Sequence, residues 1–243
     1  MDVIVLVGGK GTRLSSVVNN LPKPLAPIGR QPFFDLVLHK LRQSFGESLH
    51  LILATGHLHH CFEQYALANQ HHAKISLSQE LHPLGTGGAI RQAMQLSTRE
   101  QVLVLNGDSY FDIDYLAFTQ QTSDQQAISL AAAYVQDISR FGALAIDQDT
   151  SLVTEFLEKG KQGAGYINAG VYLINKARFL ADTVSAPFSF ELYLAELAAT
   201  KTLYSRCYKA VFIDIGTPED YQKAQSMLKH LTEFDGVRWS GSD

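Results

Sequence analysis

The stretch that decides the fold is Val3-Ile4-Val5-Leu6-Val7-Gly8-Gly9-Lys10-Gly11-Thr12-Arg13-Leu14. Its opening residues are apolar and mostly β-branched, which predicts a buried parallel strand. The glycines that follow lack a Cβ atom, so the backbone of the turn can approach phosphate oxygens closely. Arg13 adds a permanent positive charge at the same place. The stretch therefore predicts a strand that ends in a phosphate-binding turn.

Two common nucleotide motifs do not fit this turn. A Walker loop needs Gly-Lys followed by Ser or Thr at a set spacing, and the chain lacks it. A Rossmann fingerprint needs a third glycine where Leu14 stands. A tight strand-to-helix turn that binds nothing also explains the glycines alone. Arg13 and the motifs further along the chain favour a ligand.

The composition narrows the class of protein. With 243 residues, 46% hydrophobic and 18% charged, the chain matches a globular protein, and we expect one domain over 1–233 followed by a tail at 234–243. No segment has the apolar length of a membrane span, and the first residues lack the order of a signal peptide. We expect a cytoplasmic protein without a membrane partner. The net charge of −4 carries no basic stripe, which argues against nucleic acid.

Strands and helices alternate along the first half of the chain. Apolar spacing predicts helices near 32–45, 57–69 and 88–96, and strands at 49–54, 74–78 and 102–105. Pro22 and Pro24 predict an extended, stiff loop over 21–25 that holds Lys23. The alternation predicts a Rossmann-like α/β fold. Its mixed, mostly parallel sheet has helices on both faces and a ligand crevice at the carboxyl ends of the strands.

The second half is less regular. We expect strands at 127–135, 142–146, 166–174 and 211–215 and helices near 188–199 and 218–231. Thr217 is the expected N-cap of the last helix, because Pro218 and two acidic residues follow it. The apolar face of that helix is expected to dock on the sheet through Tyr221, Ala224, Leu228 and Leu231.

Two aspartates follow apolar strands. Asp108 comes after Val102–Leu105 and Asn106-Gly107, and Asp214 interrupts the apolar run 211–215. Carboxylates at strand ends suit Mg²⁺ that bridges phosphates, although each could also cap a neighbouring helix. Asp112 and Asp114 form an Asp-x-Asp pattern typical of metal-dependent glycosyltransferases. Their place at the expected start of a helix favours a capping role instead.

Two further groups of residues fit a nucleotide and a sugar phosphate. Residues 84–90 form a glycine-rich loop after Glu80, whose carboxylate can accept hydrogen bonds from guanine N1–H and its amino group. Glu158-Lys159 and Asn168 supply a carboxylate, an ammonium and an amide, which suit the hydroxyls and phosphate of a sugar phosphate. A loop without a ligand and a surface ion pair are the alternatives.

The order of these motifs resembles the sugar-1-phosphate nucleotidylyltransferase family across nearly the whole chain. The matching motifs are Gly8-Gly9-Lys10-Gly11-Thr12-Arg13-Leu14, Pro22-Lys23-Pro24-Leu25, Leu84-Gly85-Thr86-Gly87-Gly88, Asn106-Gly107-Asp108, Glu158-Lys159, Asn168-Ala169-Gly170 and Asp214-Ile215-Gly216-Thr217. Within the family, residues 83–90 and 106–114 most resemble the D-glycero-α-D-manno-heptose-1-phosphate guanylyltransferases. Ser109 departs from the pattern, because family members often carry an acid or asparagine there.

The resemblance implies an enzyme that makes a nucleotide sugar and pyrophosphate from a nucleoside triphosphate, with GTP favoured, and a sugar 1-phosphate. It implies Mg²⁺ as cofactor. The sequence leaves the oligomeric state open, although apolar helices on a short enzyme of this class could bury a homodimer contact. The implied catalytic residues are Arg13, Lys23 and Lys159, and the metal ligands are Asp108 and Asp214. The implied nucleotide-binding residues are Leu6, Gly8, Gly9, Gly11, Thr12, Glu80, Gly85, Thr86 and Gly88. The implied sugar-phosphate-binding residues are Asn106, Gly142, Glu158, Lys159 and Asn168.

Four other functions remain open from the sequence. Mannose-1-phosphate guanylyltransferases and N-acetylmuramate-1-phosphate uridylyltransferases share much of the motif order. A regulatory subunit that binds a nucleotide sugar without turnover would keep the same fold. A glycosyltransferase that uses Asp112 and Asp114 would act on a ready-made nucleotide sugar.

Overall fold

The computed structural model describes residues 1–9, 11, 14, 17–18, 20–120, 126–158 and 160–228. Three predicted site residues, Thr12, Arg13 and Lys159, lie outside the described residues, as do Leu231 and the expected boundary at 233 with its tail.

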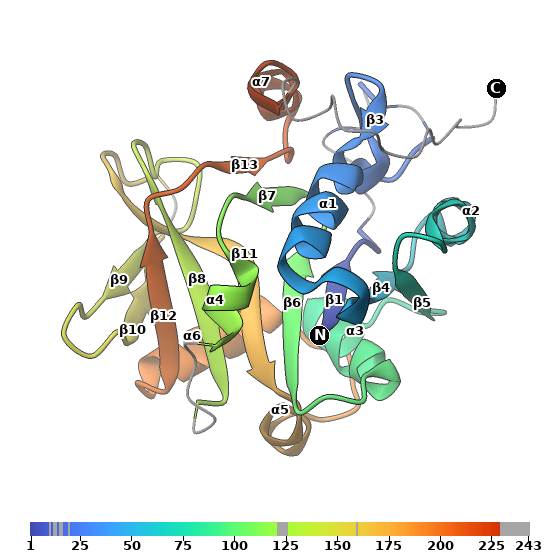
Figure 1. Ribbon diagram of the computed structural model, residues 1–243. Helices are drawn as coiled ribbons and strands as arrows, with labels where there is room; N and C mark the ends of the chain where they lie inside the picture. Colours follow the sequence, from blue (N-terminus) through green and yellow to red (C-terminus); the bar gives the residue numbers. More distant parts are fainter. Residues whose placement is uncertain are drawn as a thin grey trace.

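A seven-stranded sheet forms the centre of the fold, with the strand order β12-β8-β11-β6-β1-β4-β5 (Figure 1). Strand β1 (Asp2–Leu6) pairs in parallel with β4 (His50–Thr55) and β6 (Gln101–Asn106), and β4 pairs in parallel with β5 (Lys74–Gln79). Strand β11 (Gly165–Asn175) is antiparallel to β6 and β8 (Ile128–Val135), and β12 (Leu203–Tyr208) is parallel to β8. The prediction of a mixed, mostly parallel sheet is confirmed.

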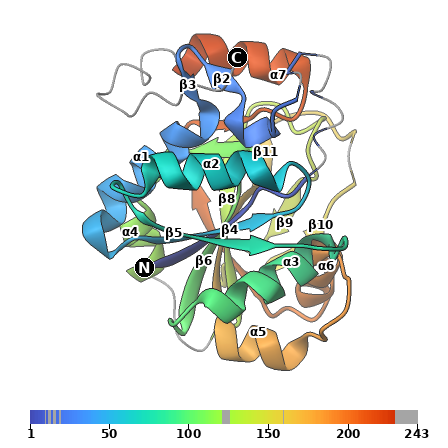
Figure 2. The same ribbon diagram turned by 90° about the vertical axis from the view of Figure 1, so that its right-hand side faces the viewer.

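Both faces of the sheet are covered by helices. Figure 2 shows α1 (Phe33–Phe45) and α2 (His59–Asn69) on one face, and α3 (Gly85–Ala93), α5 (Lys176–Asp182) and α6 (Phe190–Ala199) on the other. Alternate residues of β1 enter the two cores, because Val3 and Val5 pack on the α1 side and Ile4 packs on the α3 side. A strand buried on both faces reads as a continuous apolar run, which is why the opening stretch predicted it.

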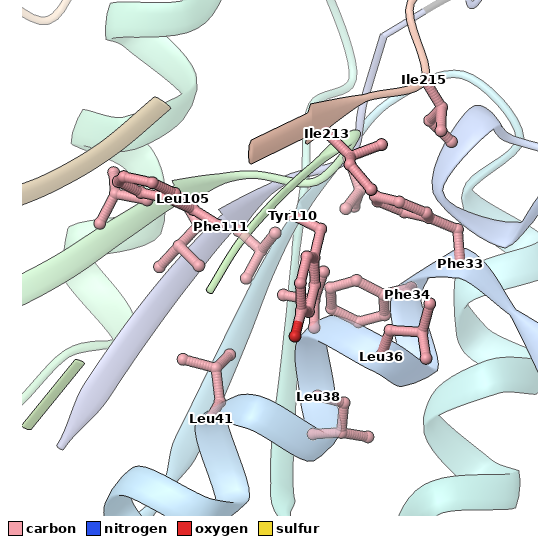
Figure 3. Packing of buried hydrophobic residues seen from close by; sticks show 14 of the residues in the cluster. Phe33, Phe34, Leu36, Leu38, Leu41, Leu105, Tyr110, Phe111, Ile213 and Ile215 are labelled. Atoms are coloured by element: carbon pink, nitrogen blue, oxygen red, sulfur yellow. The ribbon is translucent and has the colours of Figure 1, made fainter. Parts of the chain in front are cut away.

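A short antiparallel ribbon lies beside the sheet, formed by β7 (Ser109–Phe111) and β13 (Phe212–Asp214). Figure 3 shows that Phe33 and Phe34 of α1 pack near Tyr110 and Ile213 of this ribbon. The ribbon register places Asp214 opposite Ser109, the residue after Asp108. Because this ribbon packs on α1, the segments that carry Asp108 and Asp214 meet at a defined place although they are far apart in the sequence.

The last helix, α7 (Pro218–Leu228), begins as predicted. The backbone N–H of Asp220 donates to Thr217 Oγ1 at 3.3 Å, so Thr217 is the N-cap. Its apolar face packs mainly on β13 and on the hairpin of β2 (Pro27–Ile28) and β3 (Gln31–Pro32), where the Tyr221 hydroxyl donates to the Pro27 carbonyl. Figure 1 shows α7 near β13 and β3. The prediction that it docks on the main sheet is wrong.

Two local predictions also need correction. Residues Lys23–Leu25 form a 3₁₀ turn, η1, instead of an extended loop, because proline φ values suit a 3₁₀ turn and the Ala26 N–H closes it on the Lys23 carbonyl at 3.0 Å. Helix α3 begins at Gly85, so the glycines of the expected flexible loop form its first turn.

The remaining elements complete the second half of the chain. Strands β9 (Leu144–Ile146) and β10 (Val153–Phe156) form a hairpin, and α4 (Tyr115–Gln120) follows β7. Two further 3₁₀ turns cover Gly46–Ser48 and Met94–Leu96. The expectations had omitted β12, whose sequence is half polar, and α5, in which Phe179 alone is buried. Within the described residues, no helix is long and apolar enough to cross a membrane.

Candidate active site

A cavity of about 690 Å³ opens at the carboxyl ends of β1, β4, β5 and β6, where the crevice was expected. Ten of the predicted site residues line it, and they are Leu6, Gly8, Gly9, Gly11, Lys23, Glu80, Gly85, Thr86, Asn106 and Asp108.

The glycine turn after β1 lies tightly against β4. A Cβ atom at Gly8 would lie 2.9 Å from the backbone nitrogen of Gly56, a distance that real Cβ atoms do not adopt. The Gly8 carbonyl accepts a hydrogen bond from the His57 N–H at 3.3 Å. At Gly9 a Cβ would meet nothing within 4 Å. Gly8 is therefore required by packing, while Gly9 leaves the cavity open to a ligand.

A lysine and two aspartates from distant segments meet beside this turn. The Lys23 ammonium lies 2.9 Å from Asp108 Oδ2. The Gly107 N–H donates to the Leu6 carbonyl at 3.0 Å, which ties the end of β6 to the end of β1. The Ile215 N–H donates to the Asp108 carbonyl at 3.0 Å, so the segment after Asp214 runs beside Asp108. Asp214 does not line the cavity itself.

Asp214 is an unusual carboxyl group. Burial and the neighbouring Asp108 carboxylate raise its pKa to about 6, while the Gly216 N–H and Lys23 act in the opposite direction. Its Oδ1 accepts from the Gly216 N–H at 2.6 Å, and its Oδ2 accepts from the Ser109 hydroxyl at 3.3 Å. Asp214 and Asp108 thus bring two carboxyl groups close to each other beside the Lys23 ammonium.

This donor set fits a divalent cation. Within the described residues, no group of three histidine, cysteine or acidic side chains is arranged to hold a metal alone. A cation between Asp108 and Asp214 would therefore take its other ligands from water and substrate phosphates, as Mg²⁺ commonly does.

Another side of the cavity is built at the end of β5. Glu80 Oε2 accepts the Leu84 N–H at 2.9 Å, and Glu80 Oε1 lies close enough to contact a Cβ placed on Gly8. Thr86 donates its hydroxyl to Glu191 Oε2 at 2.8 Å. Gly88 does not line the cavity; a Cβ there would lie 2.8 Å from Leu84 Cβ, so this glycine allows packing between protein segments.

Two of the residues expected to hold the sugar phosphate, Asn106 and Asn168, lie on the neighbouring strands β6 and β11. Asn168 stands at a bulge of β11, where its amide donates to the Tyr172 hydroxyl at 2.8 Å and its Oδ1 accepts the Gly170 N–H at 3.0 Å. Gly170 packs against the Asn106 side chain. Gly142 and the exposed Glu158 lie near β11. Each is next to a residue of one hydrogen-bonded pair, in which the Leu157 N–H donates to the Ala143 carbonyl, and Ala143 forms a β-bridge with Ile167 of β11. None of Gly142, Glu158 and Asn168 lines the cavity.

The Asp-x-Asp pattern lies elsewhere. Asp114 Oδ1 accepts the Ala117 N–H at 2.9 Å in the first turn of α4, and Asp112 binds Lys40. Neither carboxylate lines the cavity. The capping interpretation is supported for Asp114, whereas Asp112 forms an ion pair.

The sequence analysis missed several side chains that line the cavity, among them His57, His82 and Glu191. For Glu191 one signal was present: Ser189 is an N-cap residue, and an acid then stands in the first turn of the helix. That pattern predicts a helix start, but it does not show which cavity the start adjoins.

Comparisons with known proteins agree with this geometry. The nucleotidyl transferase family model matches residues 2–230. The chain is 40% identical to the D-glycero-alpha-D-manno-heptose 1-phosphate guanylyltransferase of Aneurinibacillus thermoaerophilus, over 95% of this chain and 99% of that protein. It is 36% identical to the protein of the same name from Campylobacter jejuni, over 91% and 97% of the two chains. The structure of HddC from Yersinia pseudotuberculosis complexed with GMP-PN superimposes with a TM-score of 0.82 at 34% identity, covering 93% of this chain and 98% of that chain.

Proposed function

The chain belongs to the nucleotidyl transferase family, and we propose that it transfers GMP from GTP to D-glycero-α-D-manno-heptose 1-phosphate with release of pyrophosphate. One observation carries this proposal. Lys23, Asp108 and Asp214 come from three distant segments and meet beside a cavity lined by the glycine turn. The identity with two heptose 1-phosphate guanylyltransferases supports the choice of both substrates.

The reaction needs no nucleophile from the protein. A phosphate oxygen of the sugar 1-phosphate forms a bond to the α-phosphorus of GTP. The bond from that phosphorus to the bridging oxygen breaks, and pyrophosphate leaves with the electron pair. The attacking phosphate is already ionised at neutral pH, so the protein must align two anions and neutralise their charge. Lys23 stands where it can do so, and we assign the same task to Arg13 and Lys159.

We assign a Mg²⁺ ion to Asp108 and Asp214, whose carboxylates would hold it. When bound, the ion supplies positive charge to the phosphates that react and leave. The raised pKa of Asp214, caused first by burial and then by Asp108, supports the assignment because a cation would relieve that repulsion.

The remaining residues divide between the two substrates. We propose that Glu80 accepts from the guanine N1–H and amino group. Leu6, Gly8, Gly9, Gly11, Thr12, Gly85 and Thr86 would form the rest of the nucleotide site, whereas Gly88 serves the packing behind it. Asn106, Gly142, Glu158, Lys159 and Asn168 would hold the sugar phosphate. We further propose a cytoplasmic enzyme and a homodimer, which the molar mass in solution tests.

A matrix of nucleoside triphosphates against sugar 1-phosphates, scored by pyrophosphate release with Mg²⁺, tests the function. We expect the highest kcat/KM for GTP with the heptose 1-phosphate. Higher values with mannose 1-phosphate, or with UTP and N-acetylmuramate 1-phosphate, would change the substrate and keep the reaction. Binding without turnover in every pair would indicate a regulatory protein. Consumption of a nucleotide sugar without use of free GTP would contradict the proposal.

A further inference from the structure

Residues 186–191 pack against the start of α3, and Glu191 at the end of this segment lines the cavity. The Gly87 N–H donates to the Phe188 carbonyl at 3.0 Å, and the Phe188 N–H donates to the Leu84 carbonyl at 3.0 Å. The Phe190 N–H donates to Thr86 Oγ1 at 2.9 Å. The glycine-rich start of α3 and the segment that leads into α6 therefore form one hydrogen-bonded unit.

The glycines of α3 allow these two segments to approach each other closely. A Cβ at Gly87 would lie 2.1 Å from the Phe188 ring, and one at Gly85 would lie 2.5 Å from the Phe188 carbonyl oxygen. Thr86 stands between them, lines the cavity and directs its hydroxyl to Glu191. The close approach of the two segments thus brings Glu191 to the edge of the cavity.

The Glu191 carboxylate is held by one of its two oxygens. Its Oε2 accepts from the Thr86 hydroxyl at 2.8 Å and from the Ser189 hydroxyl at 2.9 Å. Ser189 is also the N-cap of α6, where its Oγ accepts the Leu192 N–H at 3.2 Å. Within the described part of the chain, Oε1 has no hydrogen-bond partner. The side chain therefore lines the cavity with one acceptor unused.

Glu191 also lies between the two halves of the site. Tyr172 has a pKa raised first by burial and further by the Glu191 charge, so the two groups are near each other. The Tyr172 hydroxyl accepts from Asn168 at 2.8 Å, and the Tyr172 ring packs on Phe190 with centroids 5.0 Å apart. Glu191 thus bonds Thr86 and directly follows Phe190, whose ring packs on the tyrosine that Asn168 binds.

A carboxylate only accepts hydrogen bonds, and it repels phosphates. The donors that both proposed substrates offer to such a group are the hydroxyls of a sugar ring. We propose that Glu191 is a specificity-determining residue whose Oε1 accepts a hydrogen bond from a sugar hydroxyl of the bound substrate. That hydroxyl belongs to the ribose of the nucleotide or to the ring of the sugar 1-phosphate. The inference rests on the proposed function for the identity of the substrates.

Calorimetric binding without turnover tests the proposal. The Kd values of GDP, 2′-deoxy-GDP, 3′-deoxy-GDP and GDP-mannose are compared for the wild-type protein and Glu191→Ala. GDP-mannose is chosen because it shares the manno configuration of the proposed sugar. A hydrogen bond to a charged group changes affinity by about tenfold or more. If the ribose is bound, the preference for GDP over one deoxy-GDP falls about tenfold in the variant. If the sugar ring is bound, the preference for GDP-mannose over GDP falls instead.

One variant controls for damage to the fold. Glu196→Ala removes an exposed carboxylate from the same helix without touching the hydroxyls that hold Glu191. It is expected to keep all binding preferences, with folding checked by thermal unfolding. Unchanged preferences in Glu191→Ala, or an equal loss in Glu196→Ala, would overturn the role of Glu191 alone. Wild-type protein that binds neither GDP nor GDP-mannose would overturn the proposed function together with it.

Discussion

The charges of single side chains dominate this site, as the pair of Lys23 and Asp108 shows. Lys23 is held by the 3₁₀ turn η1 and meets Asp108 at 2.9 Å. In the proposed function its ammonium would contact phosphate oxygens of the substrates, beside the carboxylates that would hold Mg²⁺. A second pair of the same kind, Lys40 with Asp112, lies outside the cavity. The two lysines have the same side chain, so only their position relative to the cavity distinguishes them.

Replacing Lys23 is the first prediction. Lys23→Met keeps the length of the side chain and removes its charge, so we expect kcat to fall by about 10²–10³-fold, as for the loss of one charge-stabilising donor. Pyrophosphate release under saturating substrates measures the effect. Lys40→Met is the matched control and should keep kcat. Equal rates for Lys23→Met and the wild-type protein would remove Lys23 from the mechanism.

Some residues singled out by a local motif lie at the cavity, although their roles stay predictions. Lys23 and Asp108 were identified from Pro22-Lys23-Pro24 and Asn106-Gly107-Asp108, and both line the cavity. Glu191 could not be identified in this way. Its place depends on Thr86, which is 105 positions away in the sequence, and no local pattern encodes that distance.

Pairs of elements fix the shape of the site. The α3 start docks on residues 186–188 so closely that Gly87 has no room for a side chain. On the other face, α1 and α2 meet through Asp35, which accepts the Tyr65 hydroxyl at 2.7 Å. Each contact explains a residue that local propensity alone disfavours: glycine within a helix and a buried carboxyl group.

Gly87 gives a prediction at this scale. Gly87→Ala should lower the free energy of unfolding by about 1–3 kcal/mol, because the new Cβ overlaps the Phe188 ring. In a Phe188→Ala background the same change should cost nothing, since the ring is gone and alanine favours the helix. Urea unfolding of the four proteins measures this coupling. An equal cost in both backgrounds would mean that Phe188 is not the cause.

Asp35 gives a pH prediction. Burial raises its pKa to about 6 although the Tyr65 hydroxyl lowers it. The folded protein thus binds this proton more tightly than the unfolded chain. The contribution of this bound proton to the free energy of unfolding is fully present below about pH 4 and is lost as the pH rises through about 6.

In Asp35→Asn the free energy of unfolding should no longer fall as the pH rises, because an amide does not ionise and still accepts a hydrogen bond from the Tyr65 hydroxyl. We expect a gain of roughly 1–3 kcal/mol at pH 8 and a smaller gain at pH 5, measured by urea unfolding. Asp149→Asn, at an exposed position, should show no such pH dependence. A gain of the same size at both pH values would exclude ionisation of Asp35 as its source.

At the scale of the whole molecule, the sheet and the β7–β13 ribbon bring the two proposed metal ligands, Asp108 and Asp214, together. Asp108 follows β6, and Asp214 ends β13, more than a hundred residues later. The pairing of Asp214 with Ser109 and the bond from Ile215 to Asp108 join them. The site therefore exists only in the folded chain.

Metal removal and double substitution test this convergence. Chelation should abolish pyrophosphate release, and Mg²⁺ should restore it. Asp108→Asn and Asp214→Asn should each lower kcat by about 10²-fold or more, equivalent to several kcal/mol of charge stabilisation. The double variant should lose little more, because both residues would hold one ion. Asp112→Asn should keep the dependence on Mg²⁺. Losses that multiply in the double variant would contradict a shared ion.

The sequence by itself determined the features that depend on neighbouring residues. The apolar run 3–7, the helical spacing of α1 and the N-cap at Thr217 follow from periodicity and local hydrogen bonding. The order of motifs was sufficient to identify the family.

The tertiary structure alone decided the start of α3 at Gly85, the docking of α7 on β2 and β13, and the presence of Glu191 at the cavity. Each depends on contacts between residues far apart in the chain. Close packing and satisfaction of buried polar groups select among local conformations of similar energy, and those contacts form only when the whole chain has folded.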